Sequence, residues 1–325
     1  MSKGKGEKKL TPYRIILEKC LGIRSGETVL IVTDRKKRPI ANALLEEARK
    51  MAKEVGLVEI EERSVDGEEP PEFIASVMRK CNVAILVTSK SLTHTNARRQ
   101  ASEIGVRVAS LPGITDKLIS RAIPVDYDFI DRLNKKLTSL LIKTSTITVQ
   151  SPKGTNIKFR IDPARPVISD NGLLRTEGAF GNLPAGEVFL SPPEGTSEGV
   201  IVIDGSILDE IVDKPIKIEV KGGYATAITG GKTAKRLLDT ITPLGKESFN
   251  IAEFGIGTNP KAKITGNVLE DEKVIGTCHI ALGNSLSVGG RAYAKSHIDC
   301  VIRNPTVLFD KKKVIHRGKF LLGKI

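Results

Sequence analysis

Short apolar runs alternate with segments of helical spacing through the first 143 residues of the chain. Apolar runs typical of buried parallel strands lie at residues 28–33 and 82–88, and further strand-like segments lie at residues 57–60 and 106–111. Between and after them, apolar residues recur at the spacing of helices packed on a sheet, in residues 40–55, 72–79, 96–104 and 127–142. Strands and helices that alternate in this way form parallel sheets covered by helices. We therefore predict a Rossmann-like α/β domain over residues 11–143.

The pattern changes near Thr144 to alternating apolar and polar positions with many glycines. Residues 146–150 and 156–161 flank a turn-rich loop, which predicts a β-hairpin. Further strand-like segments lie at residues 199–204, 216–220, 297–303 and 306–309, and one helical segment lies at residues 233–241. For residues 144–325 we predict an α+β domain rich in antiparallel strands.

The net charge of +13 is concentrated at the two ends of the chain. Residues 1–10, which we interpret as a basic flexible tail, hold four Lys and one Glu. Residues 311–325 hold six Lys or Arg and no acid. Charged ends on a nearly balanced body are typical of solubility rather than of a dedicated ligand. Because aromatic RNA-binding motifs and paired-cysteine zinc fingers are absent from the sequence, we expect no specific nucleic-acid partner.

The remaining composition favours a cytoplasmic protein that does not bind membranes. No apolar run approaches the roughly 18 residues of a membrane-spanning helix, and the N-terminal segment lacks the apolar stretch of a signal peptide. The cysteines form no CxxC pair, which indicates free thiols at Cys20, Cys81, Cys278 and Cys300. No GxGxxG motif follows the first strand and no GxxxxGK[ST] motif occurs, so we predict no nucleotide cofactor.

Two of the four histidines lie close together in the C-terminal half and suggest a metal site. On a strand, His297 and Asp299 would point to the same face, because strand side chains alternate. His279 precedes them in a segment flanked by glycines. Two histidines and one carboxylate suit zinc, iron, cobalt or manganese. The alternative is a surface strand with His279 as an ordinary core histidine, but neighbouring carboxylates favour the metal site.

Three glutamates stand in unusual settings. Glu187 begins an apolar run, and Glu253 lies among apolar residues and glycines. A buried carboxylate needs a partner, and a metal ion is the strongest partner available. Taken alone, each of these acids is more often an exposed residue at a strand edge or on a helix. Glu194 lies in a loop braced by proline and glycine, which makes it a candidate catalytic base.

His94 and Arg98 follow the apolar run at residues 82–88. Ligands of open α/β sheets bind beyond the carboxyl ends of the strands, so both residues are candidates for a substrate cleft. The alternative is a helix N-cap cluster built by Thr93, Thr95 or Asn96. We expect His316, which lies among lysines, at the surface.

Four longer motifs contain the candidate ligands: NLPAGEVFLSPPEGTSEGVIVIDGS (182–206), IAEFGIGTNP (251–260), DEKVIGTCHIALG (271–283) and SHID (296–299). They resemble motifs of the aminopeptidase T and aminopeptidase S family of metallopeptidases. Weaker matches lie at residues 92–98, 109–115 and 122–127, so the resemblance covers roughly residues 10–320. It implies a homodimeric aminopeptidase that removes N-terminal residues from peptides.

The resemblance also implies two divalent metal ions, zinc or cobalt, that activate a water for attack on the peptide carbonyl. Carried over by motif, their ligands would be Glu187, Glu253, His279, His297 and Asp299. A metallo-aminopeptidase is therefore our main functional hypothesis.

One position departs from the family pattern. The resemblance implies a tyrosine ligand after His279, but Leu286 stands there, and Tyr293 is out of register. A related branch resembles 2,5-dihydroxypyridine dioxygenase, which implies one iron(II) ion on two histidines and one aspartate. His279, His297 and Asp299 would fit that set. We keep a mononuclear non-haem iron ring-cleaving dioxygenase as the alternative function, and a non-catalytic binding protein as a third.

Overall fold

The computed structural model describes residues 10–323, which form two compact units. Unit 1 contains the residues up to Pro124 and the segment Gly172–Pro184; unit 2 contains Val125–Asn171 and the residues from Ala185 onward. Residues 1–9 of the predicted basic tail lie outside the described part of the chain.

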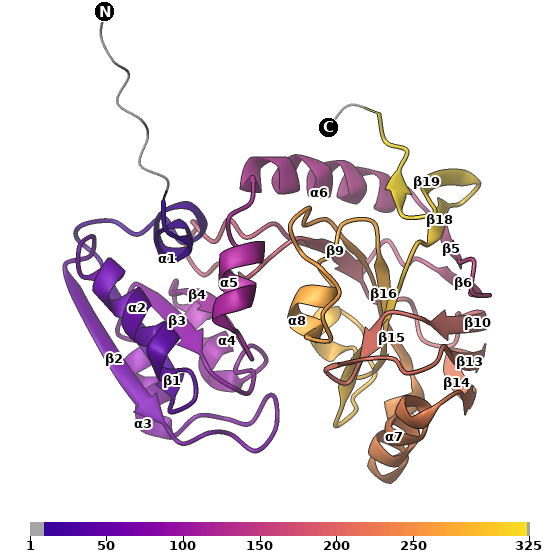
Figure 1. Cartoon of the computed structure of the whole chain (residues 1–325), viewed down its shortest axis with the longest axis horizontal. Helices are drawn as coiled ribbons and strands as arrows, with labels where there is room; N and C mark the ends of the chain where they lie inside the picture. Colours follow the sequence, from indigo (N-terminus) through magenta and orange to yellow (C-terminus); the bar gives the residue numbers. More distant parts are fainter. Residues whose placement is uncertain (1–9, 324–325) are drawn as a thin grey trace, which may run out of the picture. The chain divides into compact units, whose positions relative to one another are not determined.

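Unit 1 is built on a parallel sheet, as the alternating pattern predicted (Figure 1). Its strands, in spatial order, are β2 (Glu54–Ile60), β1 (Thr28–Asp34), β3 (Val83–Val87), β4 (Arg107–Ser110) and β8 (Phe180–Asn182). Its helices are α1 (Pro12–Ile15), which continues into η1 (Ile16–Cys20), α2 (Arg38–Ala48), α3 (Glu72–Met78), α4 (Asn96–Glu103) and α5 (Asp116–Ala122). The central strands β1, β3 and β4 are almost fully buried, which explains the continuous apolar runs of β1 and β3, whereas the buried Arg107 of β4 pairs with Glu27.

Two sequence-based boundaries in this half differ from the structure. The helix predicted over residues 40–55 ends at Ala48, and β2 begins at Glu54. Because β2 is an edge strand with half of its residues exposed, it lacks the apolar run that marks the central strands. The helix predicted over residues 127–142 is α6 (Tyr127–Leu141). This helix belongs to unit 2, because Leu133, Leu137 and Leu141 lie in the core of that unit. The chain therefore passes from unit 1 to unit 2 after Pro124, before the predicted domain boundary at residue 144.

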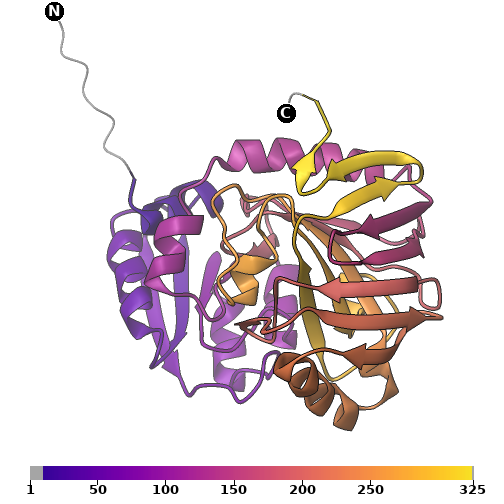
Figure 2. The ribbon, with the colours of Figure 1, turned by 45° about the vertical axis from the view of Figure 1, so that its right-hand side comes forward.

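In the described residues, unit 2 contains two large antiparallel sheets, as predicted for the second half, and a two-stranded one. The larger consists, in spatial order, of β14 (Tyr224–Thr229), β13 (Ile216–Lys221), β10 (Glu198–Ile203), β6 (Asn156–Arg160), β5 (Thr146–Gln150), β18 (Thr306–Phe309), β19 (Lys312–His316) and β20 (Lys319–Phe320). Figure 2 shows these strands stacked at the right, with α7 (Lys232–Ile241) beside β14. The smaller consists of β17 (His297–Ile302), β16 (Cys278–Gly283), β15 (Ile251–Gly257), β9 (Glu187–Leu190) and β7 (Val167–Asp170).

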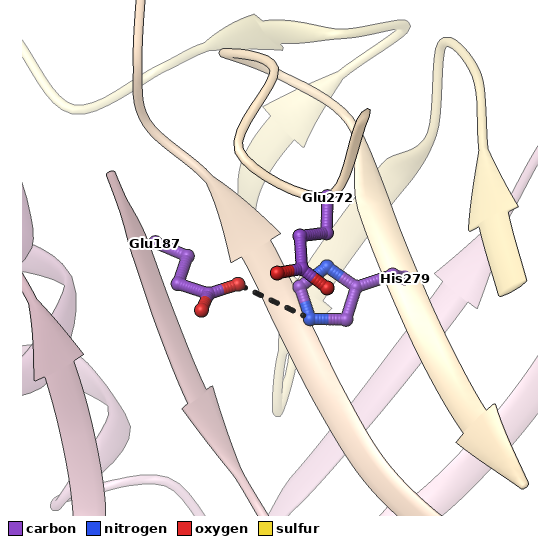
Figure 3. A group of neighbouring side chains, drawn as sticks. All are labelled: Glu187, Glu272 and His279. Atoms are coloured by element: carbon purple, nitrogen blue, oxygen red, sulfur yellow. Dashed lines mark ion pairs between the residues drawn. The ribbon is translucent and has the colours of Figure 1, made fainter. Parts of the chain in front are cut away.

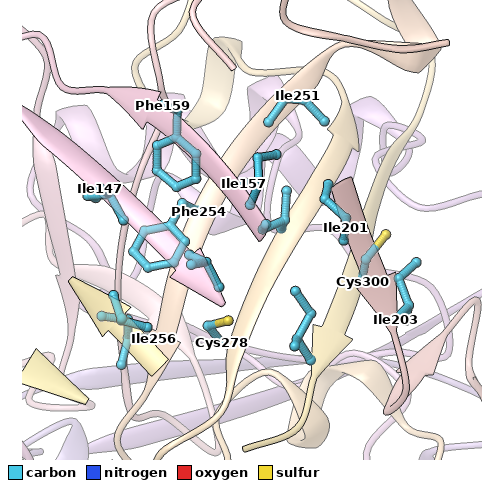
Figure 4. Packing of buried hydrophobic residues seen from close by; sticks show 14 of the residues in the cluster. Ile147, Ile157, Phe159, Ile201, Ile203, Ile251, Phe254, Ile256, Cys278 and Cys300 are labelled. Carbon is cyan, nitrogen blue, oxygen red and sulfur yellow. The ribbon is translucent and has the colours of Figure 1, made fainter. Parts of the chain in front are cut away.

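Short elements complete this unit: β11 (Ser206–Ile207), β12 (Glu210–Ile211), α8 (Val268–Asp271), and the 3-10 turns η2 (Thr242–Leu244), η3 (Lys246–Phe249) and η4 (Leu286–Val288). The core of unit 2 lies between its two sheets. Phe159 of β6 and Phe254 of β15 meet there with their ring centroids 5.2 Å apart (Figure 4). Within residues 10–323, no helix is both long enough and apolar enough to cross a membrane.

Candidate metal centre

Strand alternation sorts the smaller sheet of unit 2 into an apolar face and a polar face. The core cluster takes Phe254 and Ile256 from β15, Ile280 and Leu282 from β16, and Ile298 and Cys300 from β17. The residues between them point to the opposite face, because strand side chains alternate. That face carries Glu187, Glu253, His279, His297 and Asp299, which are the five predicted ligands.

The strand register brings these side chains together. Ala281 of β16 pairs with Glu253 on one side and with Asp299 on the other, so the two acids share a row with only a methyl group between them. In the next row, Gly255 pairs with His279. A Cβ atom at Gly255 would lie 2.1 Å from Nε2 of His279. Only glycine therefore leaves the imidazole its place across the strand.

The first donor group consists of Glu253, His297 and Asp299, each with one donor atom within 4.8 Å of the others. Nδ1 of His297 lies 2.7 Å from the carbonyl oxygen of Asn284. Because a carbonyl only accepts, Nδ1 carries the hydrogen and Nε2 faces the acids. Nε2 lies 3.4 Å from Oε2 of Glu253 and 3.6 Å from Oδ1 of Asp299. Three atoms that carry lone pairs thus converge when His297 is neutral.

The electrostatics of this group favour a cation at its centre. Burial lowers the pKa of His297, but the carboxylates of Asp299 and Glu253 outweigh it and raise the pKa well above its usual value. Oδ1 of Asp299 is buried and accepts no hydrogen bond within the described residues. A proton on His297 or a metal ion between the three side chains would satisfy these atoms.

The second donor group consists of Glu187, Glu272 and His279 (Figure 3). Glu272 comes from the segment between α8 and β16 and was not among the predicted residues. Lys273, which is fully buried, places Nζ 2.6 Å from Oε1 of Glu187 and 2.5 Å from Oε1 of Glu272. Burial raises the pKa of Glu272 well above its usual value, although Lys273 acts in the opposite direction. The sequence signal for this pair was a run of charged residues at 270–273 between short apolar segments.

His279 connects the two groups. Its Nε2 lies 3.2 Å from Oε1 of Glu253 and 3.5 Å from Oε2 of Glu187. Burial lowers the pKa of His279, but the hydrogen bond to Glu253 and the charge of Glu187 raise it to about 9. The structure therefore joins all five predicted ligands in one continuous cluster.

Glu194 does not have the environment of a catalytic base. Its carboxylate pairs with the guanidinium of Arg165 and accepts a hydrogen bond of 2.7 Å from the backbone N–H of Arg291. Partial burial raises the pKa of Glu194, but these hydrogen bonds outweigh it and lower the pKa to about 2. A general base needs a pKa near the working pH. These partners do not favour the role of a base, which stays a prediction, and they tie the 285–292 loop to the end of β9 through Glu194.

His94 and Arg98, the predicted cleft residues, lie at the start of α4 in unit 1. Arg98 is buried, donates from Nε to the carbonyl oxygen of Thr93 at 2.7 Å, and lies 3.7 Å over the ring of Phe180. Thr95 caps α4 by accepting a hydrogen bond from the backbone N–H of Arg98, which confirms the N-cap alternative. The side chain of His94 is exposed.

The structure also shows the exposure of His316 and the state of the cysteines, and it places Leu286 and Tyr293, the two residues considered for the tyrosine position of the family pattern. His316 is exposed, and the four cysteines are free thiols, as expected. Leu286 and Tyr293 are 51% and 65% exposed. Neither therefore belongs to the buried cluster.

Comparison with known proteins decides between the two enzymatic hypotheses. Residues 10–322 match the model of the family described as 2,5-dihydroxypyridine 5,6-dioxygenase. The chain belongs to this family. A 2,5-dihydroxypyridine 5,6-dioxygenase of Pseudomonas putida is 25% identical over 248 residues, which are 72% of this chain and 70% of that protein.

Solved structures show the same fold. The structure of 2,5-dihydroxypyridine dioxygenase from P. putida matches with a TM-score of 0.84 and 20% identity, over 96% of this chain and 98% of that one. The aminopeptidase AmpT from Thermus thermophilus matches with a TM-score of 0.72 and 16% identity, over 96% and 99% of the two chains. The resemblance to the aminopeptidases thus reflects a shared scaffold.

The main functional hypothesis is corrected by these findings. The prediction of a peptide hydrolase is wrong, because the family match and the curated relative are both dioxygenases, and the zinc or cobalt expected for a hydrolase has no support from them. The alternative, a dioxygenase that uses a metal, is the reading they support. A fold and a set of metal ligands are compatible with several reactions, which is why the motifs alone favoured the wrong branch.

Proposed function

We propose that the chain is a ring-cleaving dioxygenase that holds one ferrous ion among Glu253, His297 and Asp299, with His279 as a further donor at the same carboxylate. One observation carries the metal assignment. Nε2 of His297, whose Nδ1 is committed to the carbonyl of Asn284, faces Oε2 of Glu253 at 3.4 Å and Oδ1 of Asp299 at 3.6 Å. Lone pairs that converge in a buried site call for a cation.

The donor set fits iron. Two imidazoles with carboxylates are typical of non-haem ferrous oxygenases. A ferrous ion, when bound, supplies the one-electron chemistry that lets dioxygen react with an aromatic ring. The protein contributes the geometry: the carbonyl of Asn284 fixes the ring of His297, and Nε2 of His279, which lies 3.2 Å from Oε1 of Glu253, would offer its lone pair to the same ion when His279 is neutral. Burial of Glu253 and His279 keeps bulk water from these donors.

For the substrate we propose a dihydroxypyridine or a closely related hydroxylated aromatic ring. The support is the P. putida relative, whose name gives 2,5-dihydroxypyridine as its substrate. Family membership extends over almost the whole chain, from residue 10 to residue 322, and so includes every residue of the cluster.

The test is oxygen uptake by the anaerobically purified chain after loading with iron(II). We expect 2,5-dihydroxypyridine to consume one dioxygen per ring, and mass spectrometry after reaction under ¹⁸O₂ to find both labelled atoms in the opened product. His297→Ala, as the control, should show neither activity nor bound iron. Iron-loaded protein that consumes no oxygen with any dihydroxypyridine isomer would contradict the proposal.

A further inference from the structure

Lys273 occupies a position that is rare for a lysine. The residue is fully buried, and its ammonium group donates to carboxylates that belong to two different segments, Glu187 on β9 and Glu272 after α8. A buried ammonium group is stable only when anionic partners replace its lost hydration. Here the two partners are themselves members of a donor group with metal-site geometry.

The two donor groups differ in this one respect. In the first, Glu253 and Asp299 pair only with histidines, and no Lys or Arg of residues 10–323 forms an ion pair with either acid. In the second, Lys273 already supplies a positive charge to both glutamates. The first group therefore lacks a fixed cation, whereas the second has one built into the chain.

The backbone around Lys273 fixes that cation in place. Its carbonyl oxygen accepts from the backbone N–H of Asn259 at 2.8 Å, and the side-chain amide of Asn259 donates to the carbonyl of Ala185, also at 2.8 Å. Ala185 lies two residues before Glu187. The lysine and its glutamate partner are thus held by the same short network. Gly186, with φ of +128°, lets Asn259 approach closely, because a Cβ atom there would lie 2.7 Å from that of Asn259.

We propose that Lys273 is the internal cation of a second site: its ammonium group takes the place that a second divalent ion would occupy beside Glu187 and Glu272. The consequence is a chain that binds one metal ion on a surface with donors for two. The inference rests on the proposed function for the ion at the first group. It adds the residue that determines how many ions bind.

The test is equilibrium dialysis of the full-length chain against Mn²⁺, followed by elemental analysis. Truncation in Lys273→Ala frees both glutamates and leaves room, so we expect this variant to bind one Mn²⁺ more per chain than the wild type. Two adjacent Mn²⁺ ions couple magnetically, so its electron paramagnetic resonance spectrum should lose the resolved hyperfine lines of an isolated ion. Lys261→Ala is the matched control, since the side chain of Lys261 is exposed, and it should bind as the wild type does.

Two results would overturn the inference: a wild-type chain that binds two Mn²⁺ ions, or a folded Lys273→Ala variant that binds no more than the wild type. If Lys273→Ala does not fold, Glu272→Gln decides. Because Glu272 serves Lys273 and not the metal, this variant should keep the wild-type metal content, and loss of an ion would refute the assignment. If the wild-type chain binds no Mn²⁺ and the Lys273→Ala variant binds one, the result would contradict the proposed function but support the role of Lys273.

Discussion

The two faces of the smaller sheet in unit 2 are made from the same strands, yet one face is apolar and the other carries charged and polar side chains. One face buries Phe254, Ile280 and Cys300 in the core between the two sheets. The other, one residue along each strand, buries Glu253 and His279 and partly buries Asp299. The apolar face gains stability from burial, whereas the polar face concentrates charges that only a cation can balance. Neighbouring residues should therefore give separable phenotypes.

The largest effect is expected from the pair Asp299 and Cys300. Asp299→Ala should weaken metal binding by well over about 100-fold, because loss of a residue that merely orients a ligand already costs about 10–100-fold. Cys300→Ala should keep metal affinity and lose roughly 1 kcal/mol of unfolding free energy. Metal titration and chemical denaturation of both variants check this contrast. Equal metal affinity in the two variants would remove the distinction between the faces.

Phe254 is the strongest test of the apolar face. Phe254→Ala removes a fully buried ring that packs on Phe159, and should cost about 3–5 kcal/mol of unfolding free energy. Phe254→Leu, which refills part of the space, should cost less. Denaturant unfolding of the metal-free protein is the measurement. A loss below about 1 kcal/mol for Phe254→Ala would show that the sheets do not depend on this contact.

A substitution at Gly255 tests whether the polar face needs the close approach of β15 to the imidazole of His279. Gly255→Ala would drive a methyl group into the imidazole of His279 and should cost about 1–3 kcal/mol of stability, together with a loss of metal affinity. Gly26→Ala is the matched control, because no atom lies within 4 Å of a Cβ placed there. If both variants bind metal equally well, the close approach of β15 and His279 is not needed.

The smallest effect is expected at Glu194, outside the cluster. Its lowered pKa means that the Arg165 pair adds stability above about pH 4.5, and that this contribution is lost as the pH falls towards about 2. Glu194→Gln should cost about 0.2–1 kcal/mol at pH 7, as partly exposed pairs do, and nothing near pH 2. Unfolding midpoints at both pH values measure the difference. A fall in the turnover number of Glu194→Gln by about 10²–10⁴-fold would instead support the predicted role of Glu194 as a base.

Much of the fold and most of the cluster could be predicted because they depend on local pattern. The central strands of unit 1 carry continuous apolar runs, and the step of two residues from His297 to Asp299 places both on one face of β17. Homodimer formation was inferred from the resemblance alone and stays a prediction, which light scattering would test.

The remaining features depend on contacts between distant segments. Lys273 and Glu187 are 86 residues apart, and no local pattern indicates that they pair. The same holds for Arg165 and Glu194, whose ion pair no local pattern indicates. The reaction itself could not be read from the donors, because carboxylates and imidazoles serve both hydrolysis and oxygen chemistry.

The position of β8 has a consequence for how the chain matures. This strand pairs with β4 in the sheet of unit 1, but it is encoded between β7 and β9, both of which belong to unit 2. During synthesis, the edge of β4 therefore stays unpaired until Phe180–Asn182 has left the ribosome. An unpaired strand edge can form hydrogen bonds with other chains and so lead to aggregation. A fragment ending at residue 143 would keep that edge permanently. It should aggregate, whereas adding residues 172–184 in trans should restore its solubility.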